Sequence, residues 1–273
     1  MPFAAALPLG LLPISLLLGS GVIVGTTLGL IGGGGSVLAV PLLVYLVGIP
    51  PHVAIGSSAV AVAANAAWGL IAHARQGTVK WRCGMVFGSA GVAGAFAGAA
   101  FGKQLGGTEL LAAFGAVMVA IGLFMLFVGP ETNDDDIRLT RKTASNLLPR
   151  LLLIGGGVGL MSGFFGIGGG FLIVPGLILA TGMRLQNAIG TSLFAVTAFG
   201  VATSLSYGAS GLVDWRVAGL VIAGGLVGTM LGTRANNWLG QYKRGLSSVF
   251  AVVVIVTGVY IIGTGLAALL AAP

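Results

Sequence analysis

Residues 29–36 read GLIGGGGS and residues 163–170 read GFFGIGGG, and each stretch interrupts a long apolar run with clustered glycines. Glycine in a helix interior is less favourable than alanine by about 1 kcal/mol per residue, so each cluster predicts a break in a helix. The two clusters begin 134 positions apart. The first question is why an apolar chain breaks twice at matched positions.

The composition indicates a membrane protein. The chain has 273 residues, of which 56% are hydrophobic and 7% are charged, and its mean hydropathy is +1.06. Soluble domains are about one quarter charged. Apolar runs of about 20 residues recur without strand-like alternation, so the fold class is an all-α polytopic protein with the lipid bilayer as its surroundings. The first residues lack a basic signal-peptide region and are expected to belong to a retained first helix.

The chain contains an internal repeat. Residues 25–105 align without a gap with residues 159–239, and 25 of the 81 aligned pairs are identical. The segments VLAVP (37–41) and FLIVP (171–175), AIGSS (54–58) and AIGTS (188–192), and GTVKWR (77–82) and GLVDWR (211–216) fall in one register. Shared apolar composition does not reproduce these landmarks, so two homologous helical repeats are predicted.

Three regions are predicted: a first transmembrane repeat (1–128), a cytoplasmic linker (129–149) and a second transmembrane repeat (150–273). Each repeat has four full-length apolar segments, near 9–31, 53–72, 83–102 and 109–128, and near 150–165, 187–205, 217–235 and 246–266. Each also has one short segment after the glycines, at 36–47 and 171–181. Twelve helical residues span about 18 Å, less than the ~30 Å hydrocarbon core, so the short segments are half-helices, re-entrant arms or helices completed by unwound chain.

The basic residues distinguish parallel repeats from inverted ones. Cytoplasmic loops are enriched in Lys and Arg. An inverted five-plus-five arrangement places eleven basic residues inside and leaves only Lys103 and Arg216 outside, whereas a parallel arrangement gives a split of eight to five. The inside set is Arg75, Lys80, Arg82, Arg138, Arg141, Lys142, Arg150, Arg184, Arg234, Lys243 and Arg244. We therefore predict the inverted arrangement, with short interrupted helices.

The glycine breaks predict a site for a small anion. A break that opens a half-helix leaves backbone N–H groups free at the positive end of the helix dipole, and paired breaks in two repeats indicate the central site of a transporter. The helix after each short segment adds hydroxyl groups. The predicted substrate-binding residues are Gly32, Gly34, Gly35, Ser36, Ser57, Ser58, Gly166, Gly168, Gly169, Gly170, Thr191 and Ser192.

Other polar and glycine residues have alternative interpretations. His52, Asn65 and Gln186 are candidate gate or coupling residues. An interfacial position is the other interpretation of His52 and Gln186, and a helix–helix hydrogen bond explains Asn65 equally. Close helix packing is the expected role of a second set of glycines. That set is Gly91, Gly94, Gly98, Gly225, Gly228 and Gly232.

The remaining chemistry narrows the function. All six acidic residues lie in loops or at segment ends, which argues against a carboxylate proton relay, a cation pathway or acidic metal ligation. Cys83 is the only cysteine, so no internal disulfide and no cysteine-cluster metal site can form. The net charge of +7 comes from short loops, a pattern of membrane orientation rather than of nucleic-acid binding. No cofactor, metal or catalytic residue is expected. An intramembrane hydrolase using Ser57 or Ser58 with His52 would lack an acid to orient the histidine.

The doubled glycine-rich segment followed by VP, the AIGSS motif and the GxVxWR motif resemble the TauE/SafE family of sulfite-exporter-like membrane permeases, over essentially the whole chain. The resemblance implies transport of sulfite, sulfonates or sulfoacetate-like anions across the bacterial cytoplasmic membrane. Family members are usually described with seven to nine helices, fewer than the ten segments above. We expect export by alternating access, with an uptake permease or an anion channel as alternatives. The sequence does not define the oligomeric state, and a homodimer is compatible with it.

Overall fold

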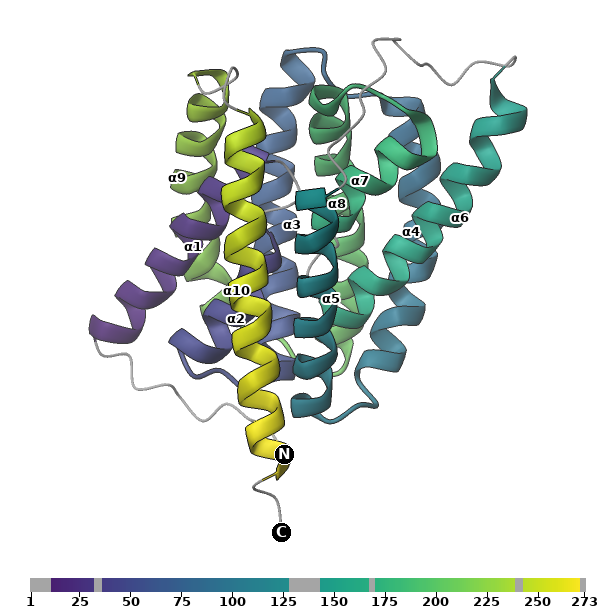
Figure 1. The fold of residues 1–273 in the computed structure, drawn as a ribbon. Coiled ribbons are helices and arrows are strands. Elements are labelled where there is room, and N and C mark those ends of the chain that lie inside the picture. The colour runs from purple at the N-terminus through teal and green to yellow at the C-terminus, as the bar shows by residue number, and fades with distance from the viewer. Residues whose placement is uncertain (1–10, 32–35, 128–142, 167–169, 239–242, 271–273) are drawn as a thin grey trace.

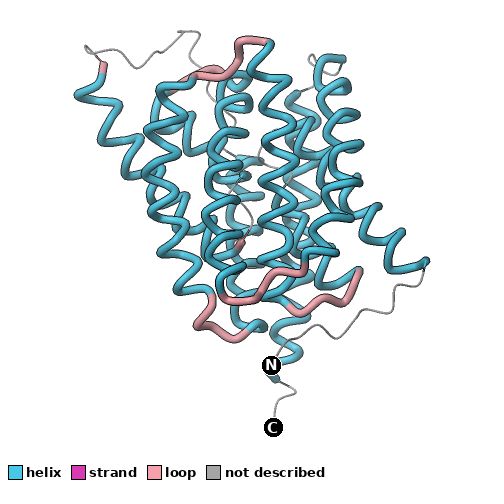
Figure 2. Tube along the Cα trace, turned by 180° about the vertical axis from the view of Figure 1, so that it is seen from behind, coloured by secondary structure: helices cyan, strands magenta, loops and turns pink. Residues whose placement is uncertain are grey.

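The computed structural model describes residues 11–31, 36–127, 143–166, 170–238 and 243–270. All regular secondary structure in these ranges is helical, as Figure 1 shows, which confirms the predicted all-α class. Short loops join the helices at both ends of the bundle (Figure 2). The elements are α1 (Leu11–Ile31), α2 (Ala39–Pro41), the π-helical turn η2 (Leu42–Leu46), α3 (Pro51–Arg75), α4 (Trp81–Gly102), α5 (Gly107–Phe127), α6 (Ala144–Phe165), α7 (Gly170–Thr181), α8 (Leu185–Ala209), α9 (Trp215–Trp238) and α10 (Lys243–Leu270).

Seven of the described helices are long and apolar enough to cross a membrane, namely α1, α3, α4, α5, α6, α8 and α9. Large apolar side chains such as Leu153 and Val256 lie exposed on the outside of the bundle, at 77% and 61% of their surface, which suits contact with lipid rather than water. The short segments are helical as well, from Ser36 to Leu46 and over the 12 residues of α7. A helix of that length covers about 18 Å and is too short to cross the hydrocarbon core alone.

The helix bounds follow the apolar segments of the sequence to within four residues, except at the start of α6. Helix α6 begins at Ala144, six residues before the apolar segment that starts at 150. Its first turn carries the polar residues Ser145 and Asn146, which hydropathy alone assigns to the linker. Residues 128–142 lie outside the described part of the chain.

Helix α1 of the first half packs along α9 of the second half. Gly25 lies against the backbone of Gly225, and Gly29 lies against the backbone of Thr229, so the two helices run parallel. These glycines bring the helix backbones together because any side chain here would overlap the neighbouring main chain.

The equivalent contact joins α6 of the second half to α4 of the first. Gly159 lies against Gly91, and Gly163 lies against Ala95, so this pair is also parallel. Gly159 is the repeat partner of Gly25, and Gly91 is the repeat partner of Gly225, because the members of each pair are 134 positions apart. The two halves therefore exchange helices. The packing role predicted for Gly91 and Gly225 is confirmed, as it is for Gly94, Gly98, Gly228 and Gly232, which also meet neighbouring helices.

Helices α3 and α8 cross at the centre of the bundle and run antiparallel. Gly56 lies against Tyr207 near one end of this pair, and Gly69 lies against Leu193 near the other. Gly56 and Tyr207 are nine and eight residues from Asn65 and Phe199, so these two repeat-related residues lie at nearly the same level of the crossing. The other repeat-related pair, α5 and α10, is also antiparallel.

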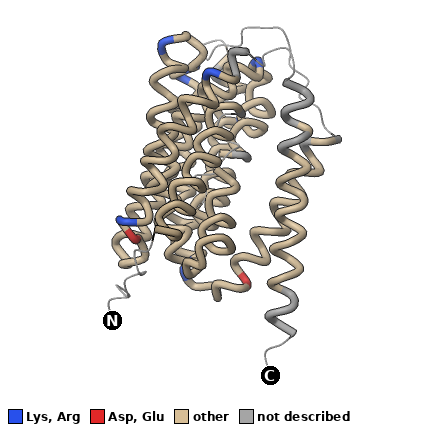
Figure 3. Tube along the Cα trace, turned by 90° about the vertical axis from the view of Figure 1, so that its left-hand side faces the viewer, with Lys and Arg blue, Asp and Glu red and all other residues tan. Residues whose placement is uncertain are grey.

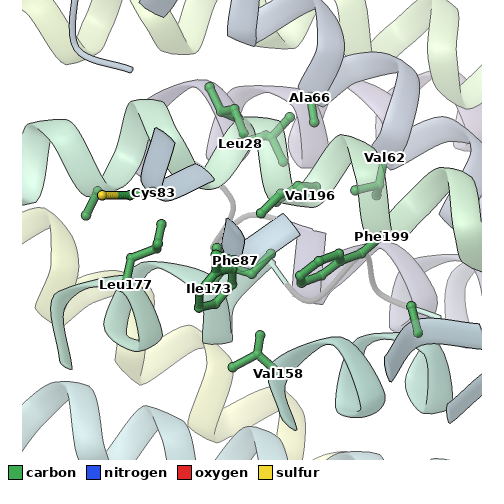
Figure 4. Close-up of a cluster of buried hydrophobic side chains, with 14 of the residues drawn as sticks. Leu28, Val62, Ala66, Cys83, Phe87, Val158, Ile173, Leu177, Val196 and Phe199 are labelled. Atoms are coloured by element: carbon green, nitrogen blue, oxygen red, sulfur yellow. The ribbon is translucent and has the colours of Figure 1, made fainter. Parts of the chain in front are cut away.

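The largest cluster of buried apolar side chains combines residues from both halves. Figure 4 shows Leu28 of α1, Val62 of α3 and Phe87 of α4 near Ile173 of α7 and Phe199 of α8. The rings of Phe87 and Phe199 stack with their centroids 6.1 Å apart. The two repeats thus form one core rather than two separate ones.

Candidate functional site

The second glycine break starts where α6 ends. Gly166 ends the helix with a φ of +65°, a left-handed conformation that glycine adopts without strain. A Cβ at Gly166 would overlap Ile55 of α3, so glycine is needed for space as well as for conformation. Helix α7 then begins at the buried Gly170.

At the first break, the described chain resumes at Ser36, directly after the glycines. Ser36, buried, begins the short helix that continues to Leu46. The other predicted glycines of the two breaks lie outside the described residues: Gly32, Gly34, Gly35, Gly168 and Gly169.

The hydroxyls of Ser57 and Thr191 make equivalent contacts with the opposite half. Ser57 Oγ accepts a hydrogen bond of 2.9 Å from the backbone N–H of Asp214, just before α9. Thr191 Oγ1 accepts one of 2.9 Å from the backbone N–H of Lys80, just before α4. The two contacts are related by the repeat, and each joins one half of the chain to a loop of the other.

Both hydroxyls remain able to donate. Ser57 and Thr191 are fully buried, and within the described part of the chain each hydroxyl acts only as an acceptor. A hydroxyl has one O–H to donate beside its acceptor lone pairs. Two buried O–H donors are therefore available in the interior.

The neighbouring hydroxyls are used differently. Ser58 donates to the carbonyl of Ile55 at 3.0 Å and lies 3.5 Å from the carbonyl of Gly166, so it joins α3 to the second glycine break. Ser192 donates to the carbonyl of Ile189 in its own helix at 2.7 Å. Ser58 thus connects the motif of the first half with the break of the second.

The predicted residues form two clusters rather than one. Ser57 lies beside Gly56, which meets Tyr207, and Tyr207 is 16 residues beyond Thr191 in α8. At 1.5 Å per residue, the two hydroxyls are roughly 24 Å apart along the helix axis. The Ser57 cluster contains Ser58 and Gly166, and the Thr191 cluster contains Ser192.

The three candidate gate residues have distinct surroundings. His52 is partly buried near the start of α3, with a buried Nε2 that has no hydrogen-bond partner in the described structure. Gln186 is exposed near the start of α8. Asn65 is fully buried in the middle of α3, and neither atom of its amide has a partner among the described residues.

Several interior polar residues were not predicted as functional. Thr229 and Thr203 are buried with hydroxyls that lack partners in the described chain. Their signal was a polar residue inside an apolar segment, the same signal that identified Asn65. Lys103 was counted only as a loop charge, yet its Nζ donates to Ser206 Oγ at 3.1 Å and to Ser210 Oγ at 3.0 Å.

The charges separate between the two ends of the bundle. Figure 3 shows Lys and Arg gathered mainly at one end, and the described acids, Glu109 and Asp214, at the other. The contact of Lys103 with Ser210 brings the α4–α5 and α8–α9 loops together at this second end. Asp214 caps α9 there by accepting from the backbone N–H of Arg216 at 2.9 Å. The described residues contain no group of three or more His, Cys, Asp or Glu side chains able to hold a metal ion.

These features define a class of protein: a multi-pass helical membrane protein whose two halves exchange helices and each contain one interrupted helix. Residues 17–261 match the family described as "Sulfite exporter TauE/SafE". The chain belongs to this family of membrane transporters and is a multi-pass protein of the cytoplasmic membrane.

Curated relatives agree with this assignment. A probable membrane transporter protein of Xylella fastidiosa is 46% identical over 260 residues, which cover 93% of this chain and 97% of the relative. The probable membrane transporter protein YunE of Bacillus subtilis is 28% identical over 265 residues, covering 90% and 96%. A third, from Methanocaldococcus jannaschii, is 29% identical over 203 residues, covering 72% and 73%. No solved structure matches the chain.

Proposed function

We propose that the protein is a secondary transporter of small anions. The observation that carries this proposal is the pair of buried hydroxyls on Ser57 and Thr191, each free to donate. Ser57 also adjoins Ser58, which lies against the second glycine break. An anion needs donors, and the described acids, Glu109 and Asp214, lie at helix starts outside the apolar interior. A donor-rich interior without carboxylates favours an anion over a cation.

The substrates we propose are sulfur oxyanions and organosulfonates, such as sulfite or sulfoacetate-like compounds. The family description supports this class. Oxyanions also accept several hydrogen bonds at once, which suits a site made of hydroxyls and backbone N–H groups. In this proposal the predicted glycines, with Ser36 and Gly170 at the starts of the short helices, supply the N–H donors.

We further propose that the repeats are inverted. Helices α3 and α8 are repeat partners and run antiparallel, as do α5 and α10. Helix α1 runs parallel to α9, and α6 runs parallel to α4. Because short turns reverse the chain between α3 and α4 and between α8 and α9, α4 and α9 point in opposite directions. Helices α1 and α6 therefore point in opposite directions as well. Inverted repeats support alternating access, because each half can close one side of the membrane in turn.

Export is the direction we propose. With an inside-negative potential, each negative charge that leaves the cell gains about 2.3 kcal/mol per 100 mV, so export needs no coupling ion. The concentration of basic residues at one end of the bundle (Figure 3) supports a cytoplasmic position for that end.

The test is a flux measurement in proteoliposomes with sulfite, sulfate, thiosulfate and short sulfonates inside. We expect saturable efflux of at least one sulfur anion, and no flux of sodium or potassium. Cation flux, or no anion flux under an imposed potential, would overturn the proposal. Anion flux that does not saturate would favour a channel.

A variant series tests the glycine site itself. Replacing Gly34 and Gly168 together by leucine should abolish efflux while the protein still elutes as a single species in detergent. The control is Gly19→Leu, because nothing lies within 4 Å of a Cβ at Gly19. Full efflux by the double variant would exclude the glycine breaks as the binding site.

A further inference from the structure

The α3–α8 crossing differs between the two halves at the level of Asn65 and Phe199. Phe199 on α8 lies over Gly91 of α4 and stacks on Phe87. The repeat-related residue on α3 is Asn65, which lies over Gly225 of α9, the repeat partner of Gly91. One side of the crossing therefore contains an aromatic contact, and the other contains an amide.

The Asn65 amide is buried without compensation. Its exposed fraction is 0%, and neither Nδ2 nor Oδ1 has a hydrogen-bond partner among the described residues. A buried amide without partners destabilises a fold, and a leucine of similar shape would avoid that loss. Packing alone thus gives no reason for asparagine at this position.

A second unpartnered group lies one helical turn away. Gly69, four residues after Asn65, meets the methyl group of Thr229, which is four residues after Gly225. The Thr229 hydroxyl is buried and has no partner in the described chain, and its repeat partner is Ala95. The amide and the hydroxyl therefore lie in the same α3–α9 interface. In the other half Phe199 replaces the amide, and the unpartnered hydroxyl belongs to Thr203, the repeat partner of Gly69.

Asn65 also lies between the two hydroxyl clusters. Ser58, Asn65 and Gly69 follow the i, i+7, i+11 spacing of one helix face. Ser58 touches the second glycine break, and Gly69 lies near the level of Thr191, because it meets Leu193. A substrate that moves along α3 from one cluster to the other passes this interface.

We propose that Asn65 and Thr229 form an intermediate binding position for the transported oxyanion between α3 and α9. The Asn65 Nδ2 group and the Thr229 hydroxyl donate to the anion when α9 separates from α3. In the structure described here the position is closed by the contact between Asn65 and Gly225. The inference rests on the proposed anion transport and assigns the path to the α3–α9 side of the crossing.

The test compares Asn65→Leu with Phe199→Leu, which introduces leucine at the repeat-related position. Flux and anion-induced thermal shift are measured with sulfite and a short sulfonate. Asn65→Leu should raise the KM for efflux at least tenfold and remove most of the thermal shift, with an unchanged or higher melting temperature without anion. Phe199→Leu should lower the melting temperature and leave the KM within about twofold.

Two additional variants separate binding from structure. Asn65→Ser, which keeps a donor, should recover part of the efflux, and Thr229→Val should raise the KM as Asn65→Leu does. A lower melting temperature for Asn65→Leu with unchanged KM would show a helix–helix contact and overturn the inference. Equal KM values for Asn65→Leu and wild type would do the same. If wild type shows no anion flux or thermal shift, the proposed function itself fails, which is a different result.

Discussion

Ser57 Oγ accepts a 2.9 Å hydrogen bond from the backbone N–H of Asp214, although the two residues are 157 positions apart in the chain. Thr191 and Lys80 repeat this contact between the other pair of segments. Each half of the chain therefore fixes the start of a long helix in the opposite half. A loop that precedes a helix needs a partner for its N–H, and here the AIGSS or AIGTS motif provides it.

Thr191→Val should destabilise the protein by about 1–3 kcal/mol, because the Lys80 N–H loses its acceptor in a partly buried position. Valine keeps the shape of threonine, so packing against Gly84 changes little. Thr191→Ser is the control, since it keeps the hydroxyl. The measurement is the apparent melting temperature in detergent. A Thr191→Val variant as stable as wild type would show that the hydrogen bond contributes nothing to stability.

Gly25→Ala should disrupt the α1–α9 pair. A Cβ at Gly25 would overlap the Gly225 backbone, and two helices in such close contact cannot accommodate a methyl group without moving apart. We expect a loss of about 1–3 kcal/mol, in the range of other overpacked sites. The comparison is Gly19→Ala on the same helix, where nothing lies within 4 Å and alanine should stabilise the helix slightly. If both variants melt at the same temperature, the close contact contributes nothing.

Gly166→Ala should lower stability and efflux together, because two costs add at this position. The left-handed φ of +65° costs a non-glycine residue about 1–2 kcal/mol, and the new methyl group would overlap Ile55. Gly211→Ala isolates the first cost, since Gly211 has a φ of +69° and no atom within 4 Å of its Cβ position. Thermal unfolding should therefore show a larger loss for Gly166→Ala. A loss no larger than that of Gly211→Ala would remove the role of the Ile55 contact.

The sequence predicts the helix bounds well because local features determine them. The apolar run and glycine cluster place the end of the first segment at residue 31, where α1 ends, and the first short segment at 36–47, where helix runs from Ser36 to Leu46. The start of α6 was placed too late. Its first residues are polar and extend past the apolar stretch, and hydropathy does not report helices outside the bilayer.

The pairing between halves is not predictable from one repeat read alone. Gly25 and Gly225 meet because two helices 200 residues apart present glycine at one contact, and nothing local to α1 specifies α9 as its neighbour. The same holds for Ser57, whose hydroxyl was predicted as a ligand group and also accepts from Asp214. Functional residues that act across the two halves need the fold before their contacts can be assigned.

Single cysteines at the starts of α4 and α9 test the proposed inversion of the repeats. Trp81 and Trp215 are repeat partners and are 47% and 67% exposed, so a cysteine at either position is accessible to a labelling reagent. The background is Cys83→Ala, which removes the native thiol, itself 1% exposed. In intact cells an impermeant thiol reagent should modify Trp215→Cys and spare Trp81→Cys until the membrane is permeabilised, because the α3–α4 loop belongs to the more basic end of the bundle.

Modification of only Trp81→Cys would reverse the orientation and keep the inversion. Modification of both from the same side would show that α4 and α9 start on one face, and the inverted arrangement would then be wrong.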